Sequence, residues 1–364
     1  MPPPLTNPAT DASAEPGRYS RQERFAPLGV EGQRRLLAAH VAIVGVGATG
    51  AAAASLLARA GVGRLTLIDR DVVEHSNLQR QILFEEADAA AALPKAEAAR
   101  RRIAASNSEV RVDARIADLT PANCEELLDG AELLLDGTDN FETRYLLNDF
   151  AVSAGRAWIY SAALGARAAG MNILPSGSVH ASRASDAAWT PTACLACIFP
   201  EAPRGDVATC ETAGILGSAV QMAAAWQTTE AIKFLSGNVD AMRRTLRTED
   251  LWSGERSEIA THRPLPDCRV CQAREFSALR GEGRPHITLC GRNAVQIHEH
   301  HRTVDLRSLS ERLRPLGPVA VNELMLRFEA APHRLTVFPD GRALIQGTTD
   351  IAMARSLYAR YVGV

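Results

Sequence analysis

The sequence predicts an α/β protein in which a mostly parallel sheet carries helices on both faces and is followed by a small C-terminal α/β module. Three observations support this prediction. Apolar runs alternate with helical segments through the first half of the chain, which is the order of a parallel sheet. The first apolar run, VAIVGVG (residues 41–47), leads through a glycine turn into an Ala-rich segment. The segment ALRGEGRPH (residues 278–286) has the Gly, Pro and charge content of a domain boundary.

The composition indicates a globular protein and excludes several classes. The chain has 364 residues, enough at roughly 150 per domain for two or three domains. Its net charge of −2 gives no electrostatic footprint for nucleic acid or membrane, and its 5% aromatic content predicts no stacking platform for bases. Residues 1–17 predict a disordered tail and lack the basic start and apolar run of a signal peptide. We therefore expect a cytoplasmic protein.

The elements of the first half follow one another at short spacing. Residues 18–40 predict an amphipathic arm with a short helix from Gly32. Gly61 and Gly63 end the first long helix, and Pro94 begins the next at a first-turn position. The predicted strands are residues 41–47, 64–69, 110–116 and part of 132–140, and the predicted helices are residues 48–63 and 94–107. Near-continuous apolar strands are those that a parallel sheet buries on both faces.

The second half is less regular. Residues 156–175 predict two more strands, and residues 181–210 a long irregular loop, which is usually functional or mobile. A long apolar helix is predicted from about Glu211 to Leu235. Its uncharged part, Ala213 to Thr229, contains Gly, Ser, Gln and Thr and predicts a buried helix rather than a membrane span of about 20 apolar residues. The expected division is a tail (1–17), a main domain (18–277) and a β-α-β-β-α module (278–364).

A glycine turn carries the first functional signal. GVGATG places Gly45, Gly47 and Gly50 at a strand-to-helix turn, where backbone N–H groups can approach a phosphate at the helix N-terminus. Asp69 ends the second strand, close to the position of the ribose acid in dinucleotide-binding folds. On this motif alone, binding of NAD or FAD is the default interpretation.

Cations beyond this motif favour a triphosphate instead. Arg80 closes the polar run that follows Asp69, and Lys95 lies in the first turn of a helix, where the macrodipole disfavours a cation by roughly 0.3–1 kcal/mol. A lysine there is either an indifferent surface residue or is aimed at an anion. Asp139, in DGTDN, is either an ordinary cap of the next helix or a Mg²⁺ ligand at the carboxyl end of a strand.

Five motifs occur in a fixed order along most of the chain: RYSRQ, IVGVGATG, LIDRDVVEHSNLQRQ, LPKAEAARRRI and DGTDN. In this combination the chain, from about Arg18 to Cys271, resembles the ThiF/MoeB/HesA family of ubiquitin-activating-type adenylyltransferases for sulfur-carrier proteins. The resemblance implies a Rossmann-like sheet that binds ATP and Mg²⁺. It also implies a reaction in which the C-terminal glycine carboxylate of a small ubiquitin-like carrier with a Gly-Gly end is adenylated.

By this resemblance, the site residues are assigned by motif. The glycine turn would lie near the phosphates, Asp69 on the ribose, and Asn77, Arg80 and Lys95 on the triphosphate, with Asp139 serving the metal. Arg21 is similar to the arginine that one subunit lends to the other, which implies a homodimer. The remaining implied contacts to the nucleotide are Ser76, Leu78, Gln79 and Asn140. Two departures are Ala48, where many members have glycine, and two extra residues between Arg80 and Lys95.

Two Cys-x-x-Cys motifs, Cys194/Cys197 and Cys268/Cys271, have the spacing of a closed four-thiolate Zn²⁺ site. The alternative is a pair of unrelated redox motifs. We expect a structural zinc that ties the long loop to a distant segment, and the resemblance agrees with this expectation.

The other cysteines differ in their context. Cys210 precedes a predicted helix, where the dipole raises the thiolate fraction. It lies in a segment that resembles the family's reactive-cysteine stretch. Two roles are therefore open for Cys210: a thiol that forms a covalent intermediate with the carrier, or an inert half-buried thiol. Cys124 is predicted to pack in a helix. Cys290 weakly suggests a persulfide loop, and His298–His301 adventitious metal binding, but neither is favoured.

The leading hypothesis is therefore ATP-dependent activation of a sulfur carrier for thiamine or molybdopterin synthesis, with sulfur from a cysteine desulfurase or another donor. Within the same class, the acceptor could instead be a peptide or a tRNA-bound carboxylate. From other classes, the alternatives are an NAD-dependent oxidoreductase and a catalytically silent scaffold that binds the carrier. The C-terminal module contains no evident metal or nucleophile set, and its predicted role is in the dimer or in docking the carrier.

Overall fold

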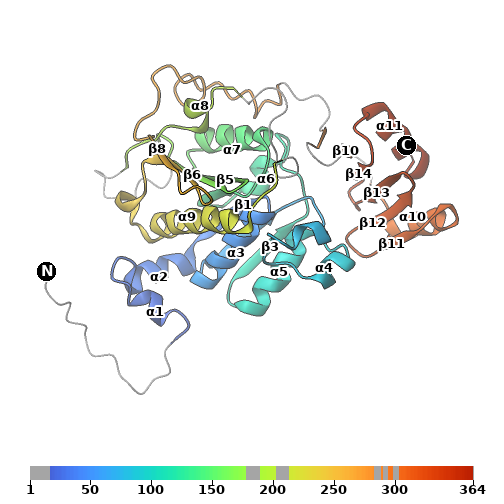
Figure 1. Cartoon of the computed structure of the whole chain (residues 1–364), viewed down its shortest axis with the longest axis horizontal. Coiled ribbons are helices and arrows are strands. Elements are labelled where there is room, and N and C mark those ends of the chain that lie inside the picture. The colour runs from blue at the N-terminus through green and yellow to red at the C-terminus, as the bar shows by residue number, and fades with distance from the viewer. Residues whose placement is uncertain are drawn as a thin grey trace, which may run out of the picture.

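The computed structural model describes residues 17–177, 189–201, 213–282, 288–289, 294–297 and 303–363. These residues form a large α/β body and a smaller unit at the C-terminal end, which lies at the right of Figure 1. The predictions for residues 1–16, Cys210, Cys290 and residues 298–301 fall outside the described residues.

The main sheet has the strand order β3-β2-β1-β4-β5-β6-β7-β8. The five strands β3, β2, β1, β4 and β5 run parallel to one another, and each of the pairs β5–β6, β6–β7 and β7–β8 is antiparallel. The strand order reverses between β1 and β4, and open α/β sheets bind ligands outside the carboxyl ends of the strands at such a point. The strands are β1 His40–Val44, β2 Arg64–Ile68, β3 Arg111–Arg115, β4 Leu133–Asp136, β5 Ala157–Leu164, β6 Arg167–Ile173, β7 Thr245–Asp250 and β8 Arg256–Ala260.

Helices cover both faces of this sheet, which confirms the predicted fold class (Figure 1). Helices α3, α5 and α9 cover one face, and α6, α7 and the cysteine-bearing α8 segment cover the other. The helices of the body are α1 Ser20–Glu23, α2 Gly29–Ala38, α3 Ala48–Ala60, α4 Glu86–Ala90, α5 Lys95–Ser106, α6 Cys124–Leu128, α7 Phe141–Ser153, α8 Leu195–Ile198 and α9 Gly217–Ser236. The short 3-10 turns are η1 His75–Asn77 and η3 Val239–Ala241.

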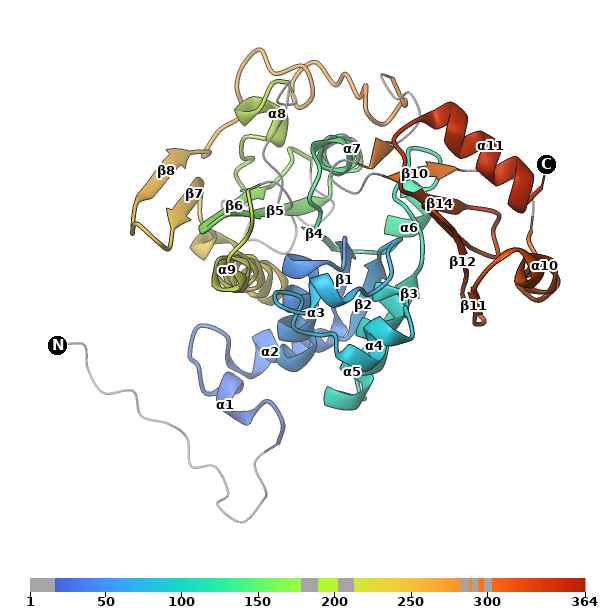
Figure 2. The ribbon, with the colours of Figure 1, turned by 45° about the vertical axis from the view of Figure 1, so that its right-hand side comes forward.

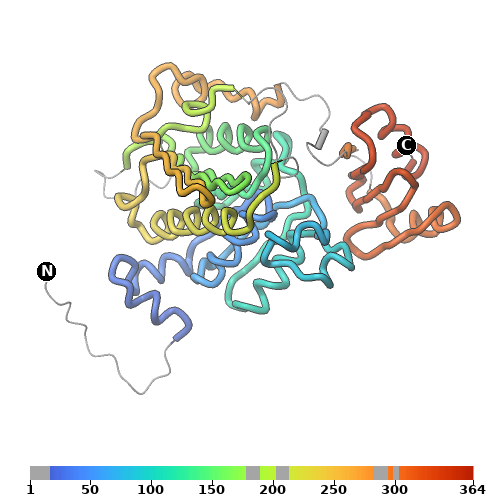
Figure 3. Tube along the Cα trace, viewed as in Figure 1, coloured from blue at the N-terminus to red at the C-terminus, as the bar shows by residue number. Residues whose placement is uncertain are grey.

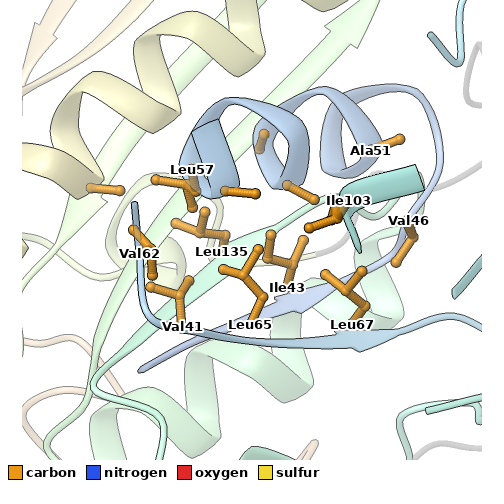
Figure 4. Close-up of a cluster of buried hydrophobic side chains, with 14 of the residues drawn as sticks. Val41, Ile43, Val46, Ala51, Leu57, Val62, Leu65, Leu67, Ile103 and Leu135 are labelled. Atoms are coloured by element: carbon orange, nitrogen blue, oxygen red, sulfur yellow. The ribbon is translucent and has the colours of Figure 1, made fainter. Parts of the chain in front are cut away.

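The two cores follow from the alternation of side chains along each strand. Val41 and Ile43 of β1 point to the face of α3, where Figure 4 shows them with Leu65 and Leu67 of β2 beneath Leu57. Ala42 and Val44, one residue out of step, belong to the core on the opposite face. Because both faces are buried, every residue of β1 is apolar except its first, His40.

Several elements differ from the sequence prediction. Helix α9 begins at Gly217 rather than near Glu211, since Ile215 forms a bridge with Gly165 just before it. Pro94 is the N-cap of α5, not its first residue. The hairpin β7–β8 was not predicted, because its strand β8 is exposed along its whole length and lacks an apolar pattern.

The C-terminal unit is an antiparallel sheet of the order β11-β12-β13-β14-β10-β9 with two helices on one face, rather than the predicted β-α-β-β-α arrangement (Figure 2). Its elements are β9 Thr288–Leu289, β10 Ala294–Ile297, α10 Leu306–Leu313, η4 Arg314–Leu316, β11 Val319–Val321, β12 Leu326–Ala330, β13 His333–Val337, β14 Ala343–Gln346 and α11 Ile351–Tyr361. The tube in Figure 3 shows this unit beside the body at the end away from α1 and α2.

No helix among the described residues is long and apolar enough to cross a membrane. Helix α9, which contains the uncharged stretch considered above, packs on α3 and on strands β5 and β6.

Candidate active site

The glycine turn connects β1 to α3 and is closed by the β4 turn beside it. Gly45 has a φ of +83°, and a Cβ there would lie 2.6 Å from the Gly137 oxygen. A Cβ on Gly50 would lie 1.8 Å from the Gly45 oxygen. Gly47, the N-cap of α3, is different, since a Cβ there would meet nothing closer than 4.0 Å. Two of the three glycines are therefore required by the turn itself, whereas Gly47, at a helix N-terminus, has room for a side chain in ordinary contact.

Asp69, at the end of β2, is held against this turn. Its carboxylate accepts hydrogen bonds from the backbone N–H of Val46, at 2.6 Å, and of Asp71, at 2.7 Å. Burial raises its pKa, against the opposing effect of Lys95. Each carboxylate oxygen has more than one acceptor site, so these two bonds leave capacity for a sugar hydroxyl.

Lys95 is buried, with 2% of its surface exposed, and its Nζ lies 3.2 Å from the Asp71 Oδ2. The backbone N–H of Lys95 also donates to the Asp71 oxygen at 2.8 Å. The lysine is thus not an indifferent surface residue, which excludes one of the two interpretations of its position. Asp71, which sequence reasoning did not select, fixes the ammonium group beside Asp69.

The turn η1 and the residues after it position the arginine. Asn77 is buried, and its Oδ1 accepts from the Glu74 N–H at 3.1 Å. Arg80 donates from Nη1 to the Ser76 oxygen at 2.7 Å and forms no ion pair with a described residue. Its charge is therefore not neutralised by a carboxylate within the described part of the chain.

The end of β4 contains one structural acid and one exposed acid. Asp136 is fully buried and accepts from Thr138 and from the Arg144 Nε at 2.8 Å. Burial lowers the pKa of Arg144, but Asp136, Tyr160 and Asp139 together outweigh this effect, and the pKa is raised. Asn140 caps α7 by accepting from the Thr143 N–H at 2.8 Å.

Asp139 is exposed and accepts no hydrogen bond from the described residues. The capping role considered for it belongs to Asn140 instead. An exposed carboxylate at the carboxyl end of β4, next to the switch point of the sheet, has the oxygen donors that Mg²⁺ prefers.

Helix α9 contacts both the turn that holds Arg80 and the end of β4. A Cβ on Gly217, its first residue, would lie 3.2 Å from the Gln79 oxygen, so the helix begins against the turn that holds Arg80. Gln227 donates from Nε2 to the Asp136 and Ile159 oxygens, both at 2.9 Å. Gln81 is buried, and its Oε1 has no hydrogen-bond partner among the described residues. Sequence reasoning selected neither glutamine, although Gln81 is the last residue of the motif LIDRDVVEHSNLQRQ; Gln227 lies in no motif.

The four predicted metal ligands converge. The sulfur atoms of Cys194, Cys197, Cys268 and Cys271 all lie within 4.8 Å of one another, and three of the separations are 3.5, 3.6 and 3.9 Å. A tetrahedral Zn²⁺ with Zn–S bonds of about 2.3 Å needs sulfurs about 3.8 Å apart. The cluster is compatible with zinc, and its four thiols belong to one site rather than two.

The remaining predicted residues are placed as follows. Ser76 and Gln79 are exposed, Leu78 is partly buried against the core, and Cys210 lies outside the described residues. Arg21 is exposed on α1, whose Gln22 donates to the Ala60 oxygen at 2.8 Å, at the C-terminal end of α3. A 13-residue helix is about 20 Å long, so Arg21 is a helix length away from the glycine turn of its own chain.

The chain is similar to a known family and to several known proteins. The model described as the ThiF family matches residues 19–270. The sulfur carrier protein ThiS adenylyltransferase of Bacillus subtilis is 42% identical over 351 residues, which cover 95% of this chain and 99% of that protein. The SAMP-activating enzyme E1 of Haloferax volcanii is 36% identical over 255 residues, 70% of this chain and 88% of that protein.

A further relative and a solved structure extend the comparison. The adenylyltransferase and sulfurtransferase MOCS3 of Mus musculus is 34% identical over 318 residues, covering 84% of this chain and 65% of that protein. The crystal structure of E. coli MccB with ATP aligns with a TM-score of 0.57 at 23% identity, over 70% of this chain and 74% of that one. At this identity the structural likeness concerns the fold alone.

Proposed function

The chain belongs to the ThiF family and is a nucleotidyltransferase, and from this premise we propose that it uses ATP to adenylate the C-terminal glycine carboxylate of a small ubiquitin-like sulfur-carrier protein. The observation that carries the proposal is the 42% identity to an adenylyltransferase named for a sulfur carrier protein, across 99% of its length. The carrier would thereby be prepared for sulfur transfer in thiamine or molybdopterin synthesis. Because the chain is a nucleotidyltransferase, the alternative of an NAD-dependent oxidoreductase is dropped.

The geometry supports a nucleotide on the carboxyl edge of the sheet. Gly47 has no side chain to obstruct a phosphate at the N-terminus of α3, and Asp69 retains acceptor sites for the ribose. Arg80 and Lys95 then supply positive charge along the triphosphate, with Asn77, Gln79 and Asn140 close by. The absence of a carboxylate partner for Arg80 among the residues described supports this role, because its charge is available to a phosphate.

In the proposed reaction, a carboxylate oxygen of the carrier attacks the α-phosphorus of ATP. A new P–O bond forms to the carrier, the bond between the α-phosphorus and the bridging oxygen breaks, and pyrophosphate leaves with the electron pair. Arg80 and Lys95 are held in place before the reaction, so they stabilise the charge that develops without reorganising. A Mg²⁺ held by Asp139 would neutralise further phosphate charge.

We propose a homodimer because of the place of Arg21. Its helix lies at the far end of α3 from the glycine turn, so this arginine serves a nucleotide site only if that site belongs to a second copy. The residue would then supply the third cation for the leaving pyrophosphate.

After adenylation, sulfur replaces the nucleotide. Cys210 would act here as the thiol that receives the carrier, displacing AMP, with a cysteine desulfurase or another donor as the sulfur source. The zinc that the cysteine cluster is suited to hold would be structural, because a site with four protein thiolates has no open position.

The direct test is ATP–pyrophosphate exchange with a carrier ending in Gly-Gly. We expect exchange by the full-length protein and a loss of about 100-fold or more in Lys95→Met, since a charge on the transferred phosphate would be unpaired. The control is Lys233→Met, the only other lysine of the chain, which pairs with Glu230 on α9. An absence of exchange with several different carriers would contradict the proposal.

A further inference from the structure

The face of the C-terminal sheet that α10 and α11 leave uncovered is polar and turns toward the body. Along β12, Leu326 and Phe328 are buried under the helices, while Arg327 and Glu329 alternate with them on the other side. The strand register places Glu329 opposite Arg334 of β13, and Arg334 opposite Gln346 of β14. This face is therefore lined with charged and amide groups rather than with core residues.

A small apolar contact and a hydrogen bond hold this face against the body. Met325 and Phe338 cluster with Val72 and Ala92 of the segment between β2 and α5. Arg342, which is 6% exposed, donates from Nη2 to the Ile116 oxygen.

Between the two units lies a cavity of about 580 Å³. From the body it is lined by Glu74 and His75, at the start of η1, and from the C-terminal unit by Arg327, Glu329, Arg334 and Gln346, among others. None of the residues assigned above to the nucleotide lines it, so it is a separate site.

The charges that line the cavity are not balanced pair by pair. Glu329 is paired with Arg334 at 2.5 Å. The Glu74 side chain accepts from the Asn77 backbone in the cap of η1 and receives the Gln346 amide at 3.5 Å. Both acids therefore have partners of their own.

Arg327 is the exception. It is half-buried, its Nε is buried without a hydrogen-bond partner, and its side chain forms no hydrogen bond or ion pair with any residue that the structure describes. Burial, and then the nearby charge of Arg334, lowers the pKa of Arg327, and the charges of Glu74 and Glu329 only partly oppose this shift. A partly buried guanidinium without an acceptor is unfavourable, because its desolvation is not compensated.

We propose that this cavity binds a small free oxyanion, a phosphate- or carboxylate-bearing metabolite, with Arg327 as its principal cation. Arginine presents a planar donor fork that matches both groups. The Gln346 amide and His75 line the same cavity and provide further donors, and its volume is sufficient for a small metabolite. The proposal stands independently of the reaction on the carrier, because it uses none of the residues assigned to ATP.

The test is calorimetric titration of the full-length protein in phosphate-free buffer of low ionic strength. A non-hydrolysable ATP analogue is kept at saturation so that the nucleotide site is filled. The probes are inorganic phosphate and pyrophosphate in one arm and citrate in the other, which distinguishes phosphate-class from carboxylate-class ligands. The variants are Arg327→Gln and, as matched control, Arg307→Gln on the exposed side of α10.

We expect wild type and Arg307→Gln to bind at least one probe alike, and Arg327→Gln to bind it about tenfold more weakly or worse, the size of one charge-assisted contact. Without anions, Arg327→Gln should melt at or above the wild-type temperature, since it removes an uncompensated charge. Absence of binding in both arms, equal binding by Arg327→Gln, or a lower melting temperature of that variant without anions would each overturn the proposal. The affinity for the ATP analogue, measured separately, shows whether the nucleotide site is intact in each variant.

Discussion

Single residues decide much of this site through contacts that no motif specifies. Asp136 and Asp139 belong to the same pentapeptide, yet one is fully buried with Arg144 and the other is exposed. Removing one member of a buried ion pair leaves an uncompensated charge, which typically costs about 3–5 kcal/mol. Asp136 is therefore a structural residue of the β4 turn, and only Asp139 has a carboxylate available for a metal.

Asp149 of α7 provides a pH-dependent test at this scale. Its Oδ2 accepts from the backbone N–H groups of Ala278 and Leu279, and burial raises its pKa to about 6. The folded protein therefore binds a proton more readily than the unfolded chain, and the associated stability is lost as the pH rises through about 6. Asp149→Asn keeps an acceptor but cannot ionise.

We expect the free energy of unfolding of Asp149→Asn to improve relative to wild type as the pH is raised from below 4 to above 6. Urea unfolding at acidic and at neutral pH measures the difference. Asp129→Asn, at an exposed position, is the control and should give a difference that does not vary with pH. A difference independent of pH for Asp149→Asn as well would refute the expectation.

At the scale of elements, the β1–α3 turn separates two uses of glycine. A Cβ on Gly50 would collide with the Gly45 oxygen, whereas a Cβ on Gly47, which has a φ of −79°, would meet its nearest neighbours at 4.0 Å, an ordinary contact. The sequence motif treats these glycines alike. The structure assigns Gly50 to packing, and Gly47 to the space that we propose a phosphate occupies.

We predict opposite results for two alanine variants. Gly50→Ala should be destabilised by about 3 kcal/mol, the upper end for overpacking, because the obstructing atom is backbone. Gly47→Ala should fold with nearly unchanged stability but bind ATP more weakly, since its methyl group fills the phosphate approach. Thermal unfolding together with ATP titration distinguishes them. Equal ATP affinity in Gly47→Ala and wild type would place the phosphates elsewhere.

The cysteine cluster joins α8 to the segment after β8, two elements about seventy residues apart in sequence. We expect the purified protein to contain one zinc per chain and Cys268→Ser to lose it. The melting temperature should fall by roughly 10 °C, since each kcal/mol shifts it by about 2–4 °C and a structural metal contributes several. Elemental analysis and thermal unfolding measure both. Cys124→Ser, outside the cluster, should retain its zinc.

At the scale of the whole molecule, the proposed dimer can be tested by mixing. Arg21→Ala and Lys95→Met should each be inactive alone in pyrophosphate exchange. If the arginine acts on the partner's site, each mixed dimer contains one intact site. Equal mixing with subunit exchange should then restore about a quarter of the wild-type activity, because half of the dimers are mixed. No recovery, in a mixture shown to contain mixed dimers, would place the arginine's role within its own chain.

The parallel half of the fold could be predicted because its signals are local. An apolar run such as residues 41–47, together with its glycines, predicts both the strand and the turn that follows it from only a few residues. The hairpin β7–β8 could not, since β8 is an exposed edge strand whose pairing comes from β7 and not from its own pattern. The C-terminal sheet was predicted with three strands rather than six, because the sequence pattern does not separate β9 from β10 or β13 from β14, and because β11 is only three residues long.

The sequence by itself determined the order of strand, glycine turn and helix, the four cysteines of the cluster, and the acid and cations of the nucleotide motif. Each of these is a chemical group at a defined place along the chain. Only the tertiary structure decided that Lys95 is buried on Asp71, that Asn140 rather than Asp139 caps α7, and that the Arg327 side chain lines a cavity with no partner among the described residues. The physical reason is that burial and pairing depend on which distant residues the fold brings within a few ångströms, and local pattern carries no information about that distance.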